Sequence, residues 1–313
     1  MNSLKKGSLC LICKTKGTKK EADIYLPAYR LPICKEHYLD WVVRRVEETI
    51  KEFRMIKRDD RILVAVSGGK DSLALWDILV KLGYEADGFY INLGIGEYSE
   101  DSKELAIKFS KEINRTLHII SLKDELLPIP KLKEKFNKPT CSVCGTVKRY
   151  YMNKKAKELG YNVLATGHNL DDEVAVLFKN VLTWDINYLS RQYPVLEEED
   201  GFVRKVKPLC RMSEKEMALY SFFRGIEYIE YECPFAEGAS TIETKKFISA
   251  LEEKSPGMKL QFYNSFLKRV YPLMKDKDQK VILKSCKICG EPSVNDTCSV
   301  CNMKLKIEDY TKS

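Results

Sequence analysis

Two groups of four residues have the spacing of closed tetrahedral metal sites. The first is C-x-x-C, twenty residues and C-x-x-H, and consists of Cys10, Cys13, Cys34 and His37. The second is C-x-x-C, eight residues and C-x-x-C, and consists of Cys286, Cys289, Cys298 and Cys301. Two close pairs of thiolate or imidazole ligands suit Zn²⁺, and a module of about thirty residues needs metal to fold. We predict two structural zinc sites; free thiols or an iron centre are the alternatives.

A third set of cysteines has a different pattern. Cys141 and Cys144 form a lone C-x-x-C, and 88 residues separate Cys144 from Cys233, which precedes a proline. Cysteine followed by proline recurs near iron–sulfur clusters, and three thiolates can hold a [4Fe–4S] cluster while one iron stays open. The residues alone fit equally a redox-active pair with a resolving cysteine, or buried thiols. Cys210 has no partner at metal-ligand spacing, and we interpret it as structural.

A phosphate loop is indicated where an apolar run ends. Ile62 to Val66 are all apolar, and Ser67-Gly68-Gly69-Lys70-Asp71-Ser72 follows at once. Two glycines let the backbone approach a ligand, and the N-terminus of the next helix offers free N–H groups to an anion. Lys70 adds positive charge, and Asp71 suits Mg²⁺ beside a phosphate. A serine-capped tight turn is the alternative interpretation.

A second block has the same strand, glycine and helix order. Gly167-His168-Asn169-Leu170-Asp171-Asp172 follows a short apolar segment. Its acids could act only as helix caps, and His168 could satisfy the core or bind a nucleotide. We favour the nucleotide site for His168, because a neutral imidazole suits a polar pocket.

The elements that must position these residues alternate between strand and helix. Strands are expected near 62–66, 86–93, 116–122 and 162–166, and helices near 38–55, 72–82, 101–113, 144–159, 170–182, 213–223, 244–253 and 260–274. This alternation predicts an α/β fold with a doubly wound parallel sheet, in which ligands bind beyond the carboxyl ends of the strands. We divide the chain into an N-terminal zinc module with a linking helix (1–56), a catalytic domain (57–235), a basic helical segment (236–284) and a C-terminal zinc ribbon (285–313).

Charge is unevenly distributed along the 313 residues. Residues 1–58 carry 14 Lys and Arg against 7 Asp and Glu, residues 245–284 carry 10 against 4, and the span 59–244 carries 25 against 30. Basic flanks favour a polyanionic partner, although a lysine-rich surface is also typical of thermophiles. No apolar run approaches the ~20 residues of a membrane span, and the polar N-terminus does not resemble a signal peptide, so we expect a cytoplasmic protein.

Ser-Gly-Gly-Lys-Asp-Ser resembles the PP-loop signature of the adenine-nucleotide α-hydrolases, a HUP-like fold, and Gly-His-Asn-x-Asp-Asp looks like the second block of PP-loop tRNA-modifying enzymes. The resemblance implies that ATP·Mg²⁺ is cut between its α and β phosphates and that a carbonyl is adenylated. It implies catalytic roles for Asp71, Lys148 and Asp172, although Lys148 could equally be a surface lysine. The nucleotide contacts implied are Ser67, Gly68, Gly69, Lys70, Asp71, Ser72, Gly167, His168 and Asp172.

The whole arrangement, with paired zinc modules around the PP-loop domain and three further cysteines, resembles the TtuA-type tRNA thiolation enzymes. That resemblance selects the [4Fe–4S] interpretation for Cys141, Cys144 and Cys233. It implies 2-thiolation of the T-loop 5-methyluridine of tRNA, sulfur from a ubiquitin-like carrier with a C-terminal thiocarboxylate, and a homodimer. Three alternatives remain open: wobble-uridine or cytidine 2-thiolation, a PP-loop tRNA ligase without a cluster, and a zinc-ribbon RNA-binding protein with a vestigial loop.

Overall fold

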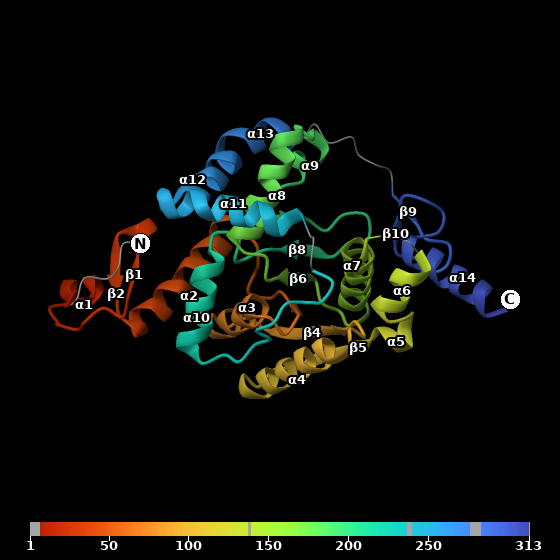
Figure 1. Cartoon of the computed structure of the whole chain (residues 1–313), viewed down its shortest axis with the longest axis horizontal. Coiled ribbons are helices and arrows are strands. Elements are labelled where there is room, and N and C mark those ends of the chain that lie inside the picture. Colours follow the sequence, from red (N-terminus) through yellow and green to blue (C-terminus); the bar gives the residue numbers. More distant parts are fainter. Residues whose placement is uncertain (1–6, 137–138, 237–239, 276–282, 313) are drawn as a thin grey trace.

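The protein is an α/β domain with a small cysteine-containing module at each end of its long axis (Figure 1). The computed structural model describes residues 7–136, 139–236, 240–275 and 283–312. Parts of the expected terminal modules and basic segment, namely residues 1–6, 237–239, 276–282 and 313, lie outside the described residues. Among the described helices, none is both long enough and apolar enough to cross a bilayer.

A six-stranded, mostly parallel sheet forms the centre, with strand order β5-β4-β3-β6-β8-β7. Its strands are β3 (Ile62–Val66), β4 (Ala86–Asn92), β5 (Leu117–Ser121), β6 (Val163–Thr166), β7 (Val195–Leu196) and β8 (Arg204–Val206). The chain proceeds outward from β3 through β4 to β5, then returns to the other side of β3 to form β6. The sheet therefore changes direction between β3 and β6, which is where ligands bind in doubly wound folds.

Helices cover both faces of this sheet because the side chains of β3 alternate between two apolar cores. Ile62, Val64 and Val66 belong to one core, with α2, α3, α8 and α10, whereas Leu63 belongs to the other, with α6 and α7. The helices of the domain are α2 (Lys35–Glu52), α3 (Lys70–Lys81), α4 (Gly96–Glu112), α5 (Leu122–Glu125), α6 (Ile129–Phe136), α7 (Thr140–Glu158), α8 (Leu170–Thr183), α9 (Ile186–Ser190) and α10 (Glu214–Arg224). The predicted doubly wound α/β fold is confirmed.

The basic segment folds back over α8. It comprises α11 (Ser240–Lys254), α12 (Met258–Ser265), a π-helical stretch (Phe266–Val270) and α13 (Tyr271–Met274). Both α11 and α12 pack against α8, whose first turn carries the acids of the second block (Figure 1). Lysines of this segment are thereby brought to the end of the sheet.

The two terminal modules are small hairpins with short helices. The N-terminal module contains α1 (Leu11–Thr15), β1 (Ile24–Leu26), a 3₁₀ turn (Pro27–Tyr29) and β2 (Leu31–Ile33). The C-terminal module contains β9 (Lys284–Ser285), β10 (Pro292–Ser293) and α14 (Ser299–Lys312). The first continues directly into α2, and the second packs on α7 through α14.

Several elements differ from the sequence prediction. Helix α2 begins at Lys35 rather than Tyr38, and the segment 260–274 is broken by its π-helical stretch. Strands β7 and β8 were not expected, and β7 runs antiparallel to β8, so the sheet is not wholly parallel. The prediction missed β8 because two of its three residues, Arg204 and Lys205, are charged, so it lacks an apolar run.

Candidate functional site

The loop between β3 and α3 is tightly interlocked. Gly68 has φ of +76°, and a Cβ there would lie 2.7 Å from the carbonyl oxygen of Ser102 on α4. The Ser67 amide donates to Ser72 Oγ at 3.1 Å, and Ser72 Oγ donates to the Gly69 carbonyl at 2.9 Å. Gly68 is thus required both by its backbone conformation and by the close approach of α4.

The second block lies directly beside this loop. Strands β3 and β6 are neighbours, and a Cβ on Gly167 would lie 2.9 Å from the backbone nitrogen of Ser72. Asn169 caps α8, accepting from the Asp172 amide while the Asp172 carboxylate accepts from the Asn169 amide. The two motifs, about a hundred residues apart in sequence, therefore form one surface at the point where the sheet changes direction.

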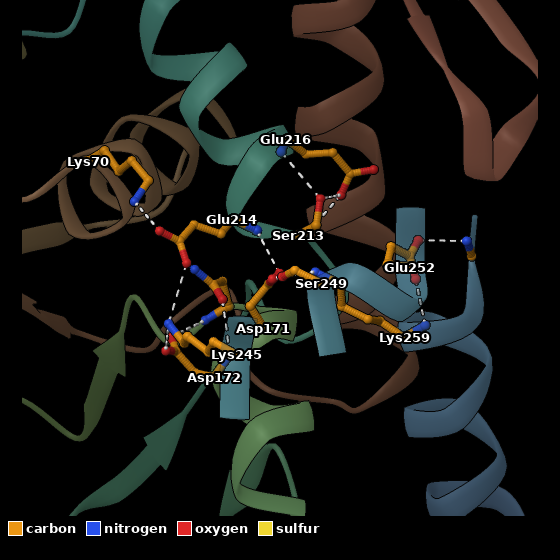
Figure 2. Close-up of polar contacts among 12 residues, drawn as sticks. Lys70, Asp171, Asp172, Ser213, Glu214, Glu216, Lys245, Ser249, Glu252 and Lys259 are labelled. Atoms are coloured by element: carbon orange, nitrogen blue, oxygen red, sulfur yellow. Dashed lines mark hydrogen bonds and ion pairs between the residues drawn. The ribbon is translucent and has the colours of Figure 1, made fainter. Parts of the chain in front are cut away.

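Charged side chains form a network over the two motifs (Figure 2). Lys70 Nζ lies 2.9 Å from Glu214 Oε1 and 3.4 Å from Asp71 Oδ2. Lys245 Nζ, from α11, lies 2.6 Å from Asp172 Oδ1 and 3.4 Å from Glu214 Oε2. Sequence analysis missed Glu214 and Lys245, which belong to no motif and lie within the helices expected near 213–223 and 244–253.

Asp171 has a different environment from Asp172. Its carboxylate is buried, pairs with Lys259 of α12 and accepts from the Glu214 amide at 2.9 Å. Asp171 thus joins α8, α10 and α12, and only Asp71 and Asp172 of the motif acids remain beside the phosphate loop.

The acids of the loop fit a divalent cation. Asp71 Oδ1 is buried without a hydrogen-bond partner. Burial raises the pKa of the Asp71 carboxyl, and Asp172 and Glu214 raise it further, while Lys70 and Asn169 lower it. A partnerless buried carboxylate oxygen among like charges is costly, and oxygen ligands of this kind are those that Mg²⁺ prefers.

His168 and a group of cations lie on the other side of the second block. Its Nδ1 is 2.9 Å from Thr166 Oγ1. The side chain of His168 is exposed at its edge but surrounded by protein on its other sides. Desolvation by this surrounding protein, followed by the positive charges of Lys205 and Lys207, lowers the pKa of His168 to about 4. Burial, followed by Lys207 and Arg149, lowers the pKa of Lys205 to about 8. His168 is therefore neutral at physiological pH and cannot supply positive charge to a phosphate.

The three internal cysteines come together from two distant segments. Cys141 and Cys144 lie in the first two turns of α7, and Cys141 Sγ contacts the Phe235 carbonyl at 3.4 Å. Burial raises the pKa of the Cys144 thiol, and Cys233 and Cys141 are near enough to raise it further, while Lys148 opposes them. The structure therefore brings Cys233 and Lys148 to Cys144.

This cysteine group is connected to the phosphate loop by a short piece of chain. The Ile229 amide donates to the Gly68 carbonyl at 3.0 Å, and Cys233 follows four residues later. Four residues span at most about 14 Å. Tyr98 on α4 lies close to Cys144 and Cys233, and α4 also touches Gly68 through Ser102. The cysteines and the phosphate loop thus line one region.

The two cysteine quartets are compact. In each, the four ligand atoms lie within 4.8 Å of one another. The Sγ atoms of Cys13 and Cys34 are 4.0 Å apart, and those of Cys289 and Cys298 are 3.8 Å apart. Tetrahedral zinc with Zn–S bonds of about 2.3 Å places sulfurs about 3.8 Å apart, so both quartets fit zinc. Cys210 is fully buried in the main core, away from any such group among the described residues.

A glycine-rich phosphate loop and a Gly-His-Asn block on adjacent strands of a doubly wound sheet define the PP-loop class of nucleotide-binding proteins. A family model described as a PP-loop domain matches residues 40–233.

Comparisons over the whole chain identify more specific relatives within the PP-loop class. A Thermus thermophilus tRNA-5-methyluridine(54) 2-sulfurtransferase is 45% identical over 94% of this chain and 91% of its own. A Pyrococcus horikoshii protein of the same name is 43% identical over 92% of both chains. The U34-tRNA thiolase NcsA from Methanococcus maripaludis, solved with its [4Fe–4S] cluster, superposes with a TM-score of 0.78 at 26% identity, over 96% of both chains.

This chain belongs to the tRNA-5-methyluridine 2-sulfurtransferase family of PP-loop proteins. The predictions of a PP-loop fold, of family membership and of a transferase are confirmed.

Proposed function

We propose that this chain is an ATP-dependent tRNA sulfurtransferase that thiolates C2 of 5-methyluridine at position 54. The proposal depends on the region beyond β3 and β6 that the phosphate loop and the cysteines share. Ile229, which hydrogen-bonds to Gly68 of the loop, is only four residues before Cys233. Relatives above 40% identity bear this name over nearly the whole chain, which favours position 54 over the wobble position named for the 26%-identical structural neighbour.

In the first half-reaction, ATP binds with its phosphates over the amides of Gly68, Gly69 and Lys70. The free N–H groups at the start of α3 stabilise the triphosphate, and Asp71 and Asp172 are the residues that would hold Mg²⁺. The uridine O2 attacks the α-phosphorus, pyrophosphate leaves, and C2 carries an adenylate. Lys148, on the face of α7 next to Cys144, stabilises negative charge on the oxygens that react.

In the second half-reaction, sulfur adds to C2 and AMP leaves with the former carbonyl oxygen. Cys141, Cys144 and Cys233 are the residues that would hold a [4Fe–4S] cluster, whose remaining iron would supply a position for sulfur. Thiolates that bind different irons stand further apart than ligands of a single ion, in keeping with a trio more open than the quartets. Its position beside Lys148 keeps the sulfur source near the activated carbonyl.

The remaining parts of the chain have supporting roles in this proposal. The quartets are the residues that would hold two structural zinc ions, and their compact ligand groups support this: Cys10, Cys13, Cys34, His37 and Cys286, Cys289, Cys298, Cys301. The basic flanks contact tRNA phosphates, a salt-sensitive contribution. The resemblance to TtuA-type enzymes supports a ubiquitin-like thiocarboxylate carrier as sulfur donor and a homodimer as the active form. The four intervals bounded at residues 56, 235 and 284 remain our proposed division of the chain.

The proposal is tested by anaerobic purification with iron and sulfide analysis, followed by reaction with unmodified and 5-methyluridine-containing tRNA, ATP·Mg²⁺ and sulfide. We expect four irons per chain beyond zinc, AMP and pyrophosphate release, and 2-thio-5-methyluridine in the digested tRNA by mass spectrometry. Thiolation at the wobble base would contradict the position but retain the chemistry. AMP release without thiolation, in protein lacking iron, would indicate a PP-loop ligase.

A further inference from the structure

Lys245 lies at the nucleotide site but belongs to neither sequence motif. It comes from α11 and approaches Asp172, at 2.6 Å, and Glu214, at 3.4 Å (Figure 2). Its side chain is 26% exposed, so the ion pair is half-buried rather than a solvated surface contact. Such a pair is screened less by solvent than an exposed one.

The backbone that carries Lys245 is held in place by the neighbouring contacts. Glu252 on α11 accepts from the amides of Gly257 and Lys259, at 2.6 and 2.8 Å, which fixes the corner between α11 and α12. Lys259 is buried, pairs with Asp171 at the start of α8, and lies 3.4 Å from Ser249 of α11. The Lys245 ammonium can therefore move on its four-carbon stem while α11 stays in place.

The charges around Lys245 are those that a bound nucleotide and metal would rearrange. Among the residues that the structure describes, the ion pairs of Asp71, Asp172 and Glu214 are formed with Lys70 and Lys245. Lys245 already occupies the Asp172 oxygen that would coordinate a divalent cation. An ammonium 2.6 Å from that oxygen and a metal ion bound to it would repel each other, so each disfavours binding of the other.

We propose that Lys245 is a positioning residue of the nucleotide site: it occupies Asp172 in the nucleotide-free chain and transfers to the phosphates when ATP·Mg²⁺ binds. Glu214 holds Lys70 and Lys245 near the phosphate loop before the nucleotide arrives. The inference rests on the proposed function, since it assigns a role in the ATP step. Its consequence is that the free chain resists metal alone and accepts metal together with a phosphate ligand.

This exchange gives a signature that a purely structural ion pair does not. In Lys245→Met, Asp172 and Glu214 lose a cation, so Mn²⁺ should bind the nucleotide-free protein several-fold more tightly. The same variant loses a phosphate contact, so ATP·Mg²⁺ should bind about tenfold more weakly, the order expected for one charge-assisted hydrogen bond. The two affinities move in opposite directions.

The experiment measures Mn²⁺ binding by electron paramagnetic resonance and ATP·Mg²⁺ binding by calorimetry, on the full chain without tRNA. Lys246→Met is the matched control, because Lys246 is the next residue on α11 and is exposed. It should change neither affinity. Lys245→Arg keeps the charge and should restore both values to within about twofold of the wild type. Circular dichroism and the unfolding midpoint check that each variant is folded.

Unchanged affinities in Lys245→Met, or a parallel fall in both, would overturn the inference. A variant that does not fold would make Lys245 structural and overturn it too. The failure of the proposed function looks different: a wild-type chain that binds ATP·Mg²⁺ yet never thiolates tRNA would contradict the reaction, while the opposite shifts at Lys245 would still stand.

Discussion

The quartets and the trio use the same residue type in two ways. Each quartet draws its ligands from a stretch of fewer than thirty residues, with all four ligand atoms within 4.8 Å and most of them buried. The trio joins α7 to a segment 88 residues away, and Cys141 is exposed while Cys144 and Cys233 are partly buried. Among the described residues, the trio does not reach the compactness of the quartets.

The difference shows that the quartets depend on local structure, whereas the trio depends on the assembled fold. A quartet forms wherever its own turns bring two C-x-x-C or C-x-x-H pairs together, so the bound ion stabilises the module that binds it. The trio exists only when β3, α4, α7 and the chain after α10 are assembled. The segment before Cys233 is held by the hydrogen bond from Ile229 to Gly68 and by that from Tyr231 to Asp101 on α4. Stability should therefore depend on the quartets and reactivity on the trio.

The largest expected effect is the loss of thiolation in Cys144→Ser. Mutation of residues that hydrogen-bond to metal ligands typically lowers metal affinity or activity by up to about 100-fold. Loss of a ligand itself should therefore reduce thiolation by about 10²-fold or more. The unfolding midpoint should change little, since Cys144 belongs to an open site. Nucleoside mass spectrometry measures thiolation, thermal unfolding measures the midpoint, and elemental analysis measures the bound iron.

Cys210→Ala is the control for that variant, since Cys210 is buried in the core apart from the trio. It should retain iron and thiolation. Full activity in Cys144→Ser would remove the distinction between the trio and structural thiols.

The next effect is on stability, in Cys34→Ser of the N-terminal quartet. Loss of a structural metal is among the changes that cost about 4 kcal/mol or more, and for a chain of this size that lowers the unfolding midpoint by roughly 10 °C. Below that midpoint, iron content should stay at the wild-type level. Calorimetry and elemental analysis test this, and a loss of iron equal to the loss of zinc would show that the sites are not separate.

The smallest effect concerns the contact between the C-terminal quartet and the helix of the trio. Glu291 is buried and accepts from Asn153 on α7 at 2.6 Å, and it pairs with Lys157 at 2.8 Å. Glu291→Gln should cost about 1 to 3 kcal/mol, because the new amide can place a second donor against Asn153. Thermal unfolding measures the loss.

Glu158 lies on the same helix and forms partly exposed ion pairs with Lys154 and Lys155. Glu158→Gln should therefore lower the free energy of unfolding by well under 1 kcal/mol. Iron content should be unchanged in both variants. A cluster lost in Glu291→Gln would mean that the quartet positions the trio.

The parts of the fold that the sequence predicted are those encoded by neighbouring residues. The five apolar residues of β3 and the glycines after them predict a buried strand and a phosphate loop, and both are present. The helix expected near 213–223 is present as α10, and Ser213 and Glu216 form a capping box at its start. The quartets were predictable in the same way, since metal-ligand spacing is a local property.

Pairings between distant residues were not predictable. Lys245 and Asp172 are 73 positions apart in the sequence and Lys70 and Glu214 are 144 apart, and no spacing rule joins either pair. Strand β8 forms because β6 offers it a partner, although its own residues lack apolar periodicity. His168 was expected in a polar site, but its low pKa depends first on burial and then on Lys205 and Lys207, which only the fold brings near.

The hydrogen bond between Ile229 and Gly68 has a consequence for how such chains can vary. It sets a fixed length of backbone between the loop and the third thiol, so one inserted residue in that interval would shift Cys233 by up to about 3.3 Å. Such a sequence would still contain every motif identified in this chain. Natural length variation should therefore be absent from residues 229–233 and tolerated in the outer loops. A relative with an insertion at 229–233 should bind nucleotide but lose the proposed cluster site.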